Sequence, residues 1–444
     1  MDLSGKNTLV VGLGRTGQAC ARFLARQGAK VRISDVRPAA ELALEMGSLA
    51  GLPVEYRLGS AQPSWLDGVD VIVPSPGVPR DHDLLQQAVA RRIPVLSEIE
   101  LAYRFFRAPL MAVTGTNGKS TTTTLIGEIM KASGQKVFVG GNLGVPFISA
   151  ASNDWDWAVL EVSSFQLEWI EQFRPRIAVL LNLTEDHLDR YPSFADYCAT
   201  KGRIFEVQKG EDSAILNRDD PRVWSMRHRV RARVVSFGFG EVAEGVFATT
   251  GEIIWRGGNG EERFSLGQVK IQGVHNVENM MAAVAAAKCA GVSGDLIQNT
   301  LNRFAGLEHR LELVREKNGV RYYNDSKGTN VGAVVKSLAS FNGPVILLAG
   351  GVGKGGDYAP LDEEIKQKVR RLILFGAAKE IMARALGALT ETAIVDDLQA
   401  AVRDAAAHAR AGDVVLLSPA CSSFDQFRNY AERGKAFKDL VQKL

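Results

Sequence analysis

The sequence predicts an α/β fold of three successive domains. Short apolar segments alternate with helical segments, a rhythm typical of parallel sheets, and this rhythm starts again twice along the chain. The length of 444 residues agrees, because one domain usually holds about 100–200 residues. We expect a Rossmann-like domain over 1–97, a central phosphate-loop ATPase-like domain over 98–306 and a second Rossmann-like domain over 307–444.

Each domain has its own set of expected elements. Strands of the first domain are short apolar runs at 7–11, 31–34 and 69–73. Those of the second lie at 110–113, 137–139, 157–161 and 177–182, with an antiparallel excursion in the Gly-rich segment 237–270. Those of the third lie at 345–348, 372–375 and 414–417. Helices are expected over 18–27, from Ser120 onward and over 280–290.

The composition is that of a globular protein without a membrane segment. Hydrophobic residues are 46% and charged residues 23% of the chain, with a net charge of +3, an ordinary globular balance. No run approaches the roughly 18 apolar residues of a membrane helix. The opening MDLSGKNTLV lacks the regions of a signal peptide. We expect no membrane insertion.

Cysteine and arginine spacing argue against two further classes. Four cysteines lie far apart without a CxxC pair, which disfavours a disulfide or metal framework and favours free thiols in a reducing cytoplasm. Arginines recur at alternate positions, at Arg227, Arg229, Arg231 and Arg233. That spacing predicts one solvated face of a strand rather than a nucleic-acid surface. We expect a cytoplasmic monomer with no nucleic-acid partner.

The first domain contains the pattern Gly12-Leu-Gly-Arg-Thr-Gly17 after a predicted strand, and Asp35 ends the next strand. Taken alone, this GxGxxG indicates an NAD-binding fingerprint. The same backbone would equally bind the diphosphate of a UDP-sugar. Nothing further along the chain supplies a hydride acceptor site, so the pattern by itself does not decide between the two.

The most informative motif is Thr114-Gly-Thr-Asn-Gly-Lys-Ser-Thr121, between a predicted strand and a predicted helix. Its glycines let backbone N–H groups close around phosphate oxygens, and the helix N-terminus adds partial positive charge. Lys119 would neutralise a γ-phosphate, and the hydroxyl of Ser120 or Thr121 would reach Mg²⁺. The GxxxxGK[ST] spacing is not met, because its first glycine would fall at Val113. The alternative is an ordinary Gly-rich left-handed turn.

This loop resembles the ATP loop of the Mur ligases and the related folylpolyglutamate synthases. The family's other motifs follow in order across essentially all 444 residues: Gly141-Asn142, Glu161 in EVSSFQLE, NLTEDHLD over 182–189, Lys201, His275-Asn276 in GVHNVEN, His309-Arg310 and Asp325-Ser326-Lys327. Within the family, the N-terminal pattern and the ending SPACSSFDQF are most similar to the branch that adds D-glutamate to UDP-N-acetylmuramoyl-L-alanine. The resemblance implies a cytoplasmic ligase of peptidoglycan synthesis, serving cell-wall biogenesis, cell shape and division.

The resemblance implies how ATP is held. It places Asn276 near the adenine and Asp325 on the ribose. The implied contacts are Gly115, Thr116, Asn117, Gly118, Lys119, Ser120, Thr121, Asn276, Arg310 and Asp325. Taken alone, Arg310 would be a solvated charge at a domain junction.

The resemblance also implies two Mg²⁺ ions held by Ser120, Glu161, His187 and Lys201. Taken alone, Glu161 would be a helix cap or surface charge, His187 a packed or exposed histidine, and Lys201 a solvated helical lysine. In the matching position the family carries a lysine converted by CO₂ to a carbamate, an anionic oxygen ligand suited to a hard cation. The implied catalytic set is Lys119, Asn142, Glu161, His187 and Lys201.

For the substrates, the resemblance favours UDP over NAD in the first domain, although Asp35 could also merely cap a strand. The implied UDP-substrate contacts are Gly14, Arg15, Thr16, Asp35, Arg37, Ser75, Gly77, Asn142, Ser163 and His187. A dicarboxylate acceptor such as D-glutamate needs cations and hydroxyl donors, because unpaired buried carboxylates are costly. The third domain offers Lys327, Thr329, Lys354, Ser423 and Tyr430, the last where the family usually has phenylalanine.

Three alternatives stay open from the sequence. A sister ligase would add another amino acid, or glutamate to a folate, although the DNPR-type sequence of relatives that add diaminopimelate or lysine is absent. An NAD-dependent oxidoreductase would use the first-domain glycines. A non-enzymatic nucleotide-binding regulator would have no reason to hold Glu161, His187 and Lys201 as a metal set.

Overall fold

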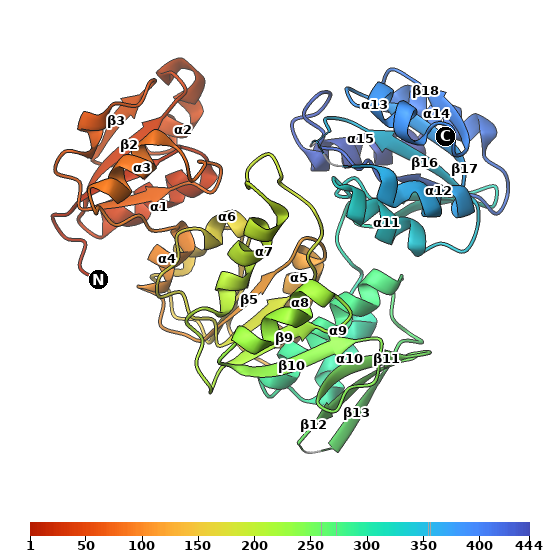
Figure 1. Cartoon of the computed structure of the whole chain (residues 1–444), viewed down its shortest axis with the longest axis horizontal. Helices are drawn as coiled ribbons and strands as arrows, with labels where there is room; N and C mark the ends of the chain where they lie inside the picture. The colour runs from red at the N-terminus through yellow and green to blue at the C-terminus, as the bar shows by residue number, and fades with distance from the viewer. Residues whose placement is uncertain (259, 272, 354, 356) are drawn as a thin grey trace.

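The computed structural model describes residues 1–444 except 259, 272, 354 and 356. Figure 1 shows three lobes, with the N-terminal and C-terminal lobes on either side of the central one. Each lobe is built on its own sheet with helices packed against it, and parallel pairing dominates. The predicted α/β class with three sheets is therefore confirmed. The domain boundaries after 97 and 306 remain predictions, and the three sheets lie inside those limits.

The N-terminal sheet has four parallel strands in the order β3-β2-β1-β4. The strands are β1 (Asn7–Val11), β2 (Lys30–Asp35), β3 (Val54–Leu58) and β4 (Val71–Pro74), and the helices are α1 (Arg15–Arg26), α2 (Ala43–Gly47) and α3 (Asp83–Ala90). Helix α1 begins earlier than the sequence predicted, so the turn after β1 is shorter. Strand β3 was not predicted, because half-buried positions alternate with exposed ones along this edge strand.

The central sheet has nine strands in the order β13-β12-β11-β10-β9-β8-β5-β7-β6. They are β5 (Leu110–Thr114), β6 (Val137–Gly141), β7 (Trp157–Glu161), β8 (Ile177–Leu180), β9 (Ser213–Asn217), β10 (Arg233–Gly238), β11 (Gly245–Thr249), β12 (Glu252–Gly257) and β13 (Gly260–Ser265). The helices are α4 (Glu98–Tyr103), α5 (Lys119–Ala132), α6 (Ser164–Leu167), α7 (Phe194–Gly202), α8 (Pro221–Ser225), α9 (Val274–Cys289) and α10 (Gly294–Arg303). Strands β11, β12 and β13 pair antiparallel and extend the main sheet.

The arginine-rich segment is not a strand, contrary to the sequence-based prediction. Asp220 caps helix α8 by accepting hydrogen bonds from the backbone of Arg222 and Val223, and Pro221 occupies the first helical position, where proline is favoured. The chain then continues as a 3₁₀ turn over Met226–Arg229, and β10 starts only at Arg233.

The C-terminal sheet has six strands in the order β14-β15-β19-β16-β17-β18. They are β14 (Glu312–Lys317), β15 (Val320–Asn324), β16 (Val345–Gly350), β17 (Val369–Phe375), β18 (Glu391–Ile394) and β19 (Val414–Leu417). The helices are α11 (Val331–Ala339), α12 (Asp362–Lys368), α13 (Lys379–Leu386), α14 (Leu398–His408) and α15 (Tyr430–Gln442). Only β14 and β15 pair antiparallel here.

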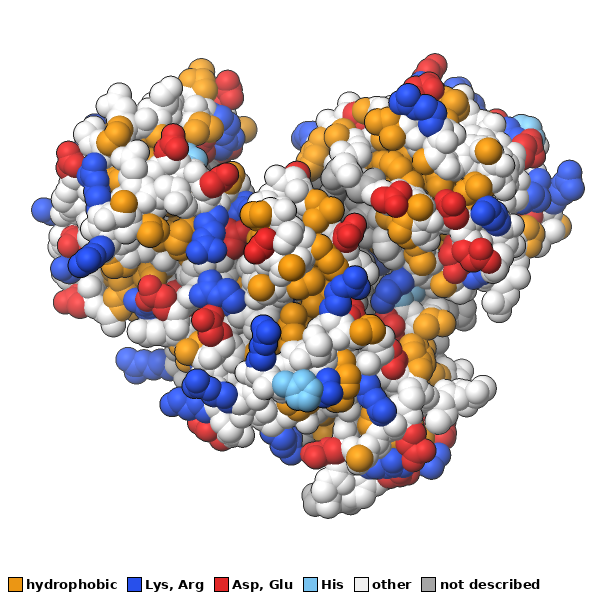
Figure 2. Space-filling view, viewed as in Figure 1, with side chains coloured by type: hydrophobic (Ala, Val, Ile, Leu, Met, Phe, Trp, Pro, Cys, Tyr) orange, Lys and Arg blue, Asp and Glu red, His pale blue; other side chains and the backbone are white. Residues whose placement is uncertain are grey.

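The C-terminal lobe touches the central lobe beside the phosphate loop. Arg310 donates to the hydroxyl of Ser120 at 2.8 Å, and Lys336 pairs with Glu278 at 2.5 Å. Figure 2 shows the surface hollowed between the two outer lobes, above the central one. Among the described residues, no helix combines the length and apolarity needed to cross a bilayer.

Candidate active site

The phosphate loop connects the buried strand β5 to helix α5, and its glycines are sterically required. Gly118 has a φ of +85°, and a Cβ there would lie 2.2 Å from the side-chain oxygen of Asn279. Gly115 has a φ of +147°, and a Cβ there would lie 3.0 Å from the Cβ of Leu181, just after strand β8. Any other residue would be strained at either position. The loop therefore needs glycine at both positions to pack against the chain that follows β8 and against helix α9.

Asn182, just after β8, fixes the phosphate loop across the sheet. Its side chain accepts from the backbone N–H of Asn117 at 2.8 Å and donates to the Asn117 carbonyl at 3.1 Å. The hydroxyl of Thr116 bonds the Thr184 carbonyl and lies 3.0 Å from the hydroxyl of Tyr197. The loop therefore has a rigid backbone before any ligand arrives.

Lys119 points back into this loop. Its ammonium donates to the carbonyls of Gly115 and Thr116 at 2.9 and 2.8 Å. Burial lowers the pKa of Lys119, while the nearby carboxylates of Glu161 and Asp186 act in the opposite direction. The ammonium of Lys119 thus lies within the phosphate loop.

Glu161 ends strand β7 and is 4% exposed. One carboxylate oxygen accepts from the side chain of Asn142 at 2.7 Å, while the other is buried without a hydrogen-bond partner. Burial acts to raise the pKa of Glu161, but the charge of Lys119, the polar side chains of Ser120 and Asn142 and the charge of Arg310 together outweigh it, so the pKa is lowered. A buried, ionised oxygen without a partner is unusual and suits a divalent cation.

Lys201, in the last turn of helix α7, is not the solvated lysine that its spacing suggested. It is 2% exposed, and its nitrogen lies 3.4 Å from the hydroxyl of Thr114 and 4.9 Å from the ring centre of Tyr197. Burial, together with the charge of Lys119, holds the pKa of Lys201 well below its ordinary value. The amine is therefore directed toward the phosphate loop.

His187 follows β8 in a left-handed conformation with a φ of +56°. This conformation costs an L-residue about 1–2 kcal/mol, so its surroundings hold it there. The ring lies against Phe165, with 4.8 Å between ring centres, and beside Asp186. Among the described residues, no three His, Cys, Asp or Glu side chains come together as a metal site.

The residues implied for ATP line a narrow cavity between the central and C-terminal lobes. From the implied set, this cavity brings together Asn117, Gly118, Thr121, Asn276, Arg310 and Asp325. Asp325 accepts from the hydroxyls of Ser337 and Ser418, and burial raises its pKa to about 6. The cavity measures about 60 Å³, whereas ligand pockets usually measure about 300–1,000 Å³.

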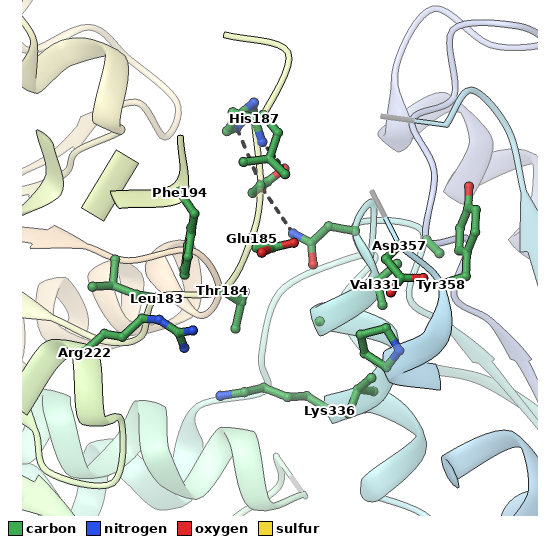
Figure 3. Close-up of a pocket in the computed structure, with 17 residues that line it drawn as sticks. Leu183, Thr184, Glu185, His187, Phe194, Arg222, Val331, Lys336, Asp357 and Tyr358 are labelled. Carbon is green, nitrogen blue, oxygen red and sulfur yellow. Dashed lines mark hydrogen bonds and ion pairs between the residues drawn. The ribbon is translucent and has the colours of Figure 1, made fainter. Parts of the chain in front are cut away.

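A larger cavity of about 550 Å³ opens beside the loop of His187. Figure 3 shows Arg222 and Lys336 entering it from opposite lobes, and Tyr358 at its far side. Asn330 of the C-terminal lobe donates a hydrogen bond to the carboxylate of Asp186 in the central lobe at 3.3 Å. The sequence analysis singled out none of these four residues.

Three of the residues predicted to contact D-glutamate line a third cavity of about 730 Å³. Thr329, Ser423 and Tyr430 line it together with His187. Lys327 is not part of the lining of this cavity, but its nitrogen lies 3.7 Å from the ring centre of Tyr430. Lys354, also predicted for this site, lies outside the described residues.

Arg433, which the sequence analysis missed, donates a hydrogen bond to the backbone of Ser422 in the lining of this third cavity. Arg433 on α15 is fully buried and donates to the hydroxyl and carbonyl of Ser326 and to the carbonyls of Gly350, Cys421 and Ser422. Burial lowers the pKa of Arg433 to about 10. Its partners are more than ten residues away in sequence, so no local pattern could have identified it.

Asp35 is the centre of a hydrogen-bond network in the N-terminal lobe, among the residues predicted to contact UDP. Its carboxylate accepts from the backbone N–H of Leu13 and from the guanidinium of Arg37, and these bonds lower the pKa of Asp35 to about 2 against the effect of burial. The hydroxyl of Ser75 bonds the Gly12 carbonyl at 2.8 Å. The implied contacts Gly14, Arg15 and Thr16 lie at the first turn of α1, whose N-cap has no side-chain hydrogen bond; Gly77 follows Ser75.

Ser163 is the N-cap residue of helix α6 in the central lobe. Its hydroxyl caps helix α6 and forms a capping box with Gln166. This cap fixes the start of the short helix that follows Glu161. A substrate contact for Ser163 stays a prediction.

The comparisons with known proteins agree along the whole chain. Family models match residues 6–97 (Mur ligase MurD-like, N-terminal domain), 113–287 (Mur ligase middle domain) and 309–421 (Mur ligase, glutamate ligase domain). Curated UDP-N-acetylmuramoylalanine–D-glutamate ligases of Geotalea uraniireducens and Geobacter metallireducens are each 52% identical over 100% of this chain and 99% of their own.

Solved structures share the fold at low sequence identity. MurF from Acinetobacter baumannii gives a TM-score of 0.62 at 18% identity, over 99% of this chain and 91% of its own. UDP-N-acetylmuramate-alanine ligase from Thermotoga maritima gives a TM-score of 0.59 at 18% identity, over 99% of both chains.

Proposed function

This chain belongs to the Mur ligase family, and on that premise we propose that it joins D-glutamate to UDP-N-acetylmuramoyl-L-alanine at the expense of ATP, in peptidoglycan precursor synthesis. The observation that carries the proposal is 52% identity over the full chain to ligases named for this reaction. The cavity lined by His187 of the central lobe and by Thr329, Ser423 and Tyr430 of the C-terminal lobe supports it, because its hydroxyl groups offer donors to a carboxylate.

The reaction proceeds in two steps. An oxygen of the terminal L-alanine carboxylate attacks the γ-phosphorus of ATP, which gives an acyl phosphate and ADP. The amine of D-glutamate then attacks the acyl carbon, and the tetrahedral intermediate loses phosphate and a proton to leave the amide. The protein contributes mainly by positioning the reactants and by neutralising charge.

The central lobe supplies the groups for phosphoryl transfer. Lys119 and the backbone N–H groups of its loop hold the β- and γ-phosphates. Asn142 orients the reacting carboxylate or the γ-phosphate while its bond to Glu161 is kept. His187 faces the acceptor cavity and helps to hold the sugar side of the substrate.

Ser120, Glu161, His187 and Lys201 would hold the metal, and the carboxylate oxygen of Glu161 that is buried without a hydrogen-bond partner supports this assignment. Two Mg²⁺ ions would neutralise the negative charge that gathers on the phosphate oxygens. A carbamate on Lys201 would add an anionic oxygen ligand and remove an ammonium beside Lys119. Because ATP and both other substrates belong to intracellular metabolism, we place the reaction in the cytoplasm.

The decisive experiment measures phosphate release with ATP, Mg²⁺ and UDP-N-acetylmuramoyl-L-alanine against a panel of D- and L-amino acids. Of the amino acids in the panel, we expect only D-glutamate to give phosphate release, and we expect a new UDP-linked dipeptide product in that reaction. Omission of the amino acid is the control. Release with another amino acid would assign the chain to a sister ligase, and no release with any would refute the proposed activity.

A further inference from the structure

Arg190, which the proposed mechanism does not use, is one of the residues through which the N-terminal and central lobes meet. Its two terminal nitrogens donate to the carbonyls of Pro76 and Val78 at 2.8 and 2.9 Å. Both carbonyls belong to the loop after β4 that carries Ser75 and Gly77, the wall assigned to the UDP substrate. The guanidinium therefore binds the substrate-binding loop of one lobe from a position on another.

Glu168 fixes the guanidinium from the central lobe. The two side chains form a bidentate pair, with distances of 3.2 and 2.8 Å, and the hydroxyl of Tyr191 donates to the same carboxylate at 2.9 Å. The side chains of Arg190 and Glu168 are only 11% and 2% exposed. Buried charges are stable only when they are paired and hydrogen-bonded, so this geometry is strongly determined.

The same guanidinium contacts the ring of Phe165, with its central carbon 3.9 Å from the ring centre. Phe165 in turn contacts the ring of His187 edge-on, at 4.8 Å between centres. Phe165 belongs to α6, the short helix that starts just after Glu161. A continuous set of contacts thus runs from the UDP-binding loop through Arg190 and Phe165 to His187.

We propose that Arg190 is a positioning residue that couples the placement of the UDP-bound N-terminal lobe to the orientation of His187. This inference rests on the proposed function. Arg190 contacts backbone carbonyls, a carboxylate and a ring, and we assign it no contact with substrate. By fixing the loop after β4, Arg190 keeps the muramoyl end of the bound substrate aligned with the phosphate loop.

Lysine cannot replace arginine in this role. A lysine keeps the charge but lacks the planar fork that serves two carbonyls and a bidentate carboxylate at once. A small misplacement of reacting groups can lower turnover by as much as about a hundredfold. We therefore expect Arg190→Lys to lower kcat by about 10- to 100-fold and to raise the KM for UDP-N-acetylmuramoyl-L-alanine, while the KM for ATP stays within about twofold.

Arg203→Lys is the matched control. Arg203 also donates to three carbonyls, those of Leu167, Glu168 and Ile170, and pairs with Glu206, but all of these partners lie in the central lobe. The Arg203→Lys variant tests whether loss of arginine hydrogen bonds within the central lobe is enough to change kcat and the KM for UDP-N-acetylmuramoyl-L-alanine. We expect both variants to lower the Tm, and only Arg190→Lys to show the split between kcat and the two KM values.

A second variant tests the path itself. Phe165→Leu removes the ring between Arg190 and His187, and it should lower kcat as Arg190→Lys does. If both act through one path, the double variant should lose little more than the worse single variant. Fully additive losses would show two independent effects and would overturn the coupling.

The outcomes separate this inference from the proposed function. If the unmodified chain has no D-glutamate-dependent activity, the function fails and this inference fails with it. If the unmodified chain is active and Arg190→Lys keeps its kcat and all three KM values, only this inference is overturned. An equal loss in Arg203→Lys would also overturn it, because a general structural role would then explain the data.

Discussion

The side chain of Asn142 donates a 2.7 Å hydrogen bond to one carboxylate oxygen of Glu161, and leaves the other oxygen buried and without a hydrogen-bond partner. Gly141, just before Asn142, pairs with Glu161 across the parallel strands β6 and β7. The two side chains therefore meet at the carboxyl edge of the central sheet, the edge at which ligands bind in such sheets. One oxygen is oriented by a neutral donor, and the other is available to a cation.

Removal of Asn142 should therefore weaken metal use. We expect Asn142→Ala to raise the Mg²⁺ concentration that gives half-maximal phosphate release by about 10- to 100-fold, the usual effect of losing a partner of a metal ligand. Asn153→Ala, at an exposed position, is the control and should leave the Mg²⁺ dependence unchanged. An unaltered dependence in Asn142→Ala would contradict a metal at Glu161.

Loss of the loop lysine should abolish turnover. Lys119→Ala removes the charge that would neutralise the transferred phosphoryl group, a type of contact worth about a hundredfold or more in rate. The fold should persist, as checked by circular dichroism, because Asn182 still holds the loop. Lys131→Ala, exposed in the last turn of the same helix α5, should be fully active. Near-normal phosphate release by folded Lys119→Ala would overturn the assignment of the phosphate loop.

The acceptor cavity should discriminate against D-glutamine. If Lys327, Thr329, Ser423 and Tyr430 hold the side-chain carboxylate, its replacement by an amide loses charge-assisted contacts and leaves donors unpaired. The cost is about 1–3 kcal/mol, which corresponds to roughly 5- to 150-fold in kcat/KM. Parallel kinetics with the two amino acids measure this ratio. Equal kcat/KM values would place the acceptor elsewhere.

The strands that position the site were predictable because they are apolar throughout. Strand β5 is buried at all five positions, and fully buried parallel strands give continuous apolar runs. Edge strand β3 was missed because charged residues alternate along it. The arginine-rich segment was predicted wrongly for a different reason: the cap at Asp220 and the proline after it start helix α8, and a 3₁₀ turn over Met226–Arg229 continues from it into this segment.

The supporting residues of the site were not predictable from local pattern. Arg190 reaches carbonyls 112 and 114 residues away, and Arg433 reaches Ser326 across 107 residues. In the sequence, neither arginine can be told apart from an ordinary surface charge. Family motifs located Lys119, Glu161 and Lys201, whereas the burial of Lys201 and the free oxygen of Glu161 came only from the structure.

Glu98 should make stability depend on pH. Burial raises the pKa of Glu98 from 4.5 to about 7, so the folded protein keeps a proton that the unfolded chain releases near pH 4.5. The folded state therefore binds this proton more tightly, and its contribution to stability is full below pH 4.5 and is lost as pH rises through about 7. A shift of this size corresponds to about 3 kcal/mol.

The test compares Glu98→Gln with the parent by urea unfolding at pH 5 and pH 8. The variant does not titrate, so its free energy of unfolding relative to the parent should increase between these values, by up to about 3 kcal/mol. Glu128→Gln, exposed on α5, should show a constant difference. A constant difference for Glu98→Gln as well would mean that Glu98 is ionised in the folded state at both values.

The final prediction is that Lys201 carries a carbamate in the active enzyme and thereby helps to hold the second Mg²⁺. Its amine is buried beside Thr114 and Tyr197, and an unmodified ammonium there would repel metal ions. Lys201→Ala should lose activity and recover part of it with a short carboxylate such as acetate, whereas Lys209→Ala, at an exposed position, should do neither. Removal of CO₂ should lower the activity of the parent reversibly. A high-resolution map of the metal-bound enzyme with an unbranched lysine end at this position would refute the carbamate.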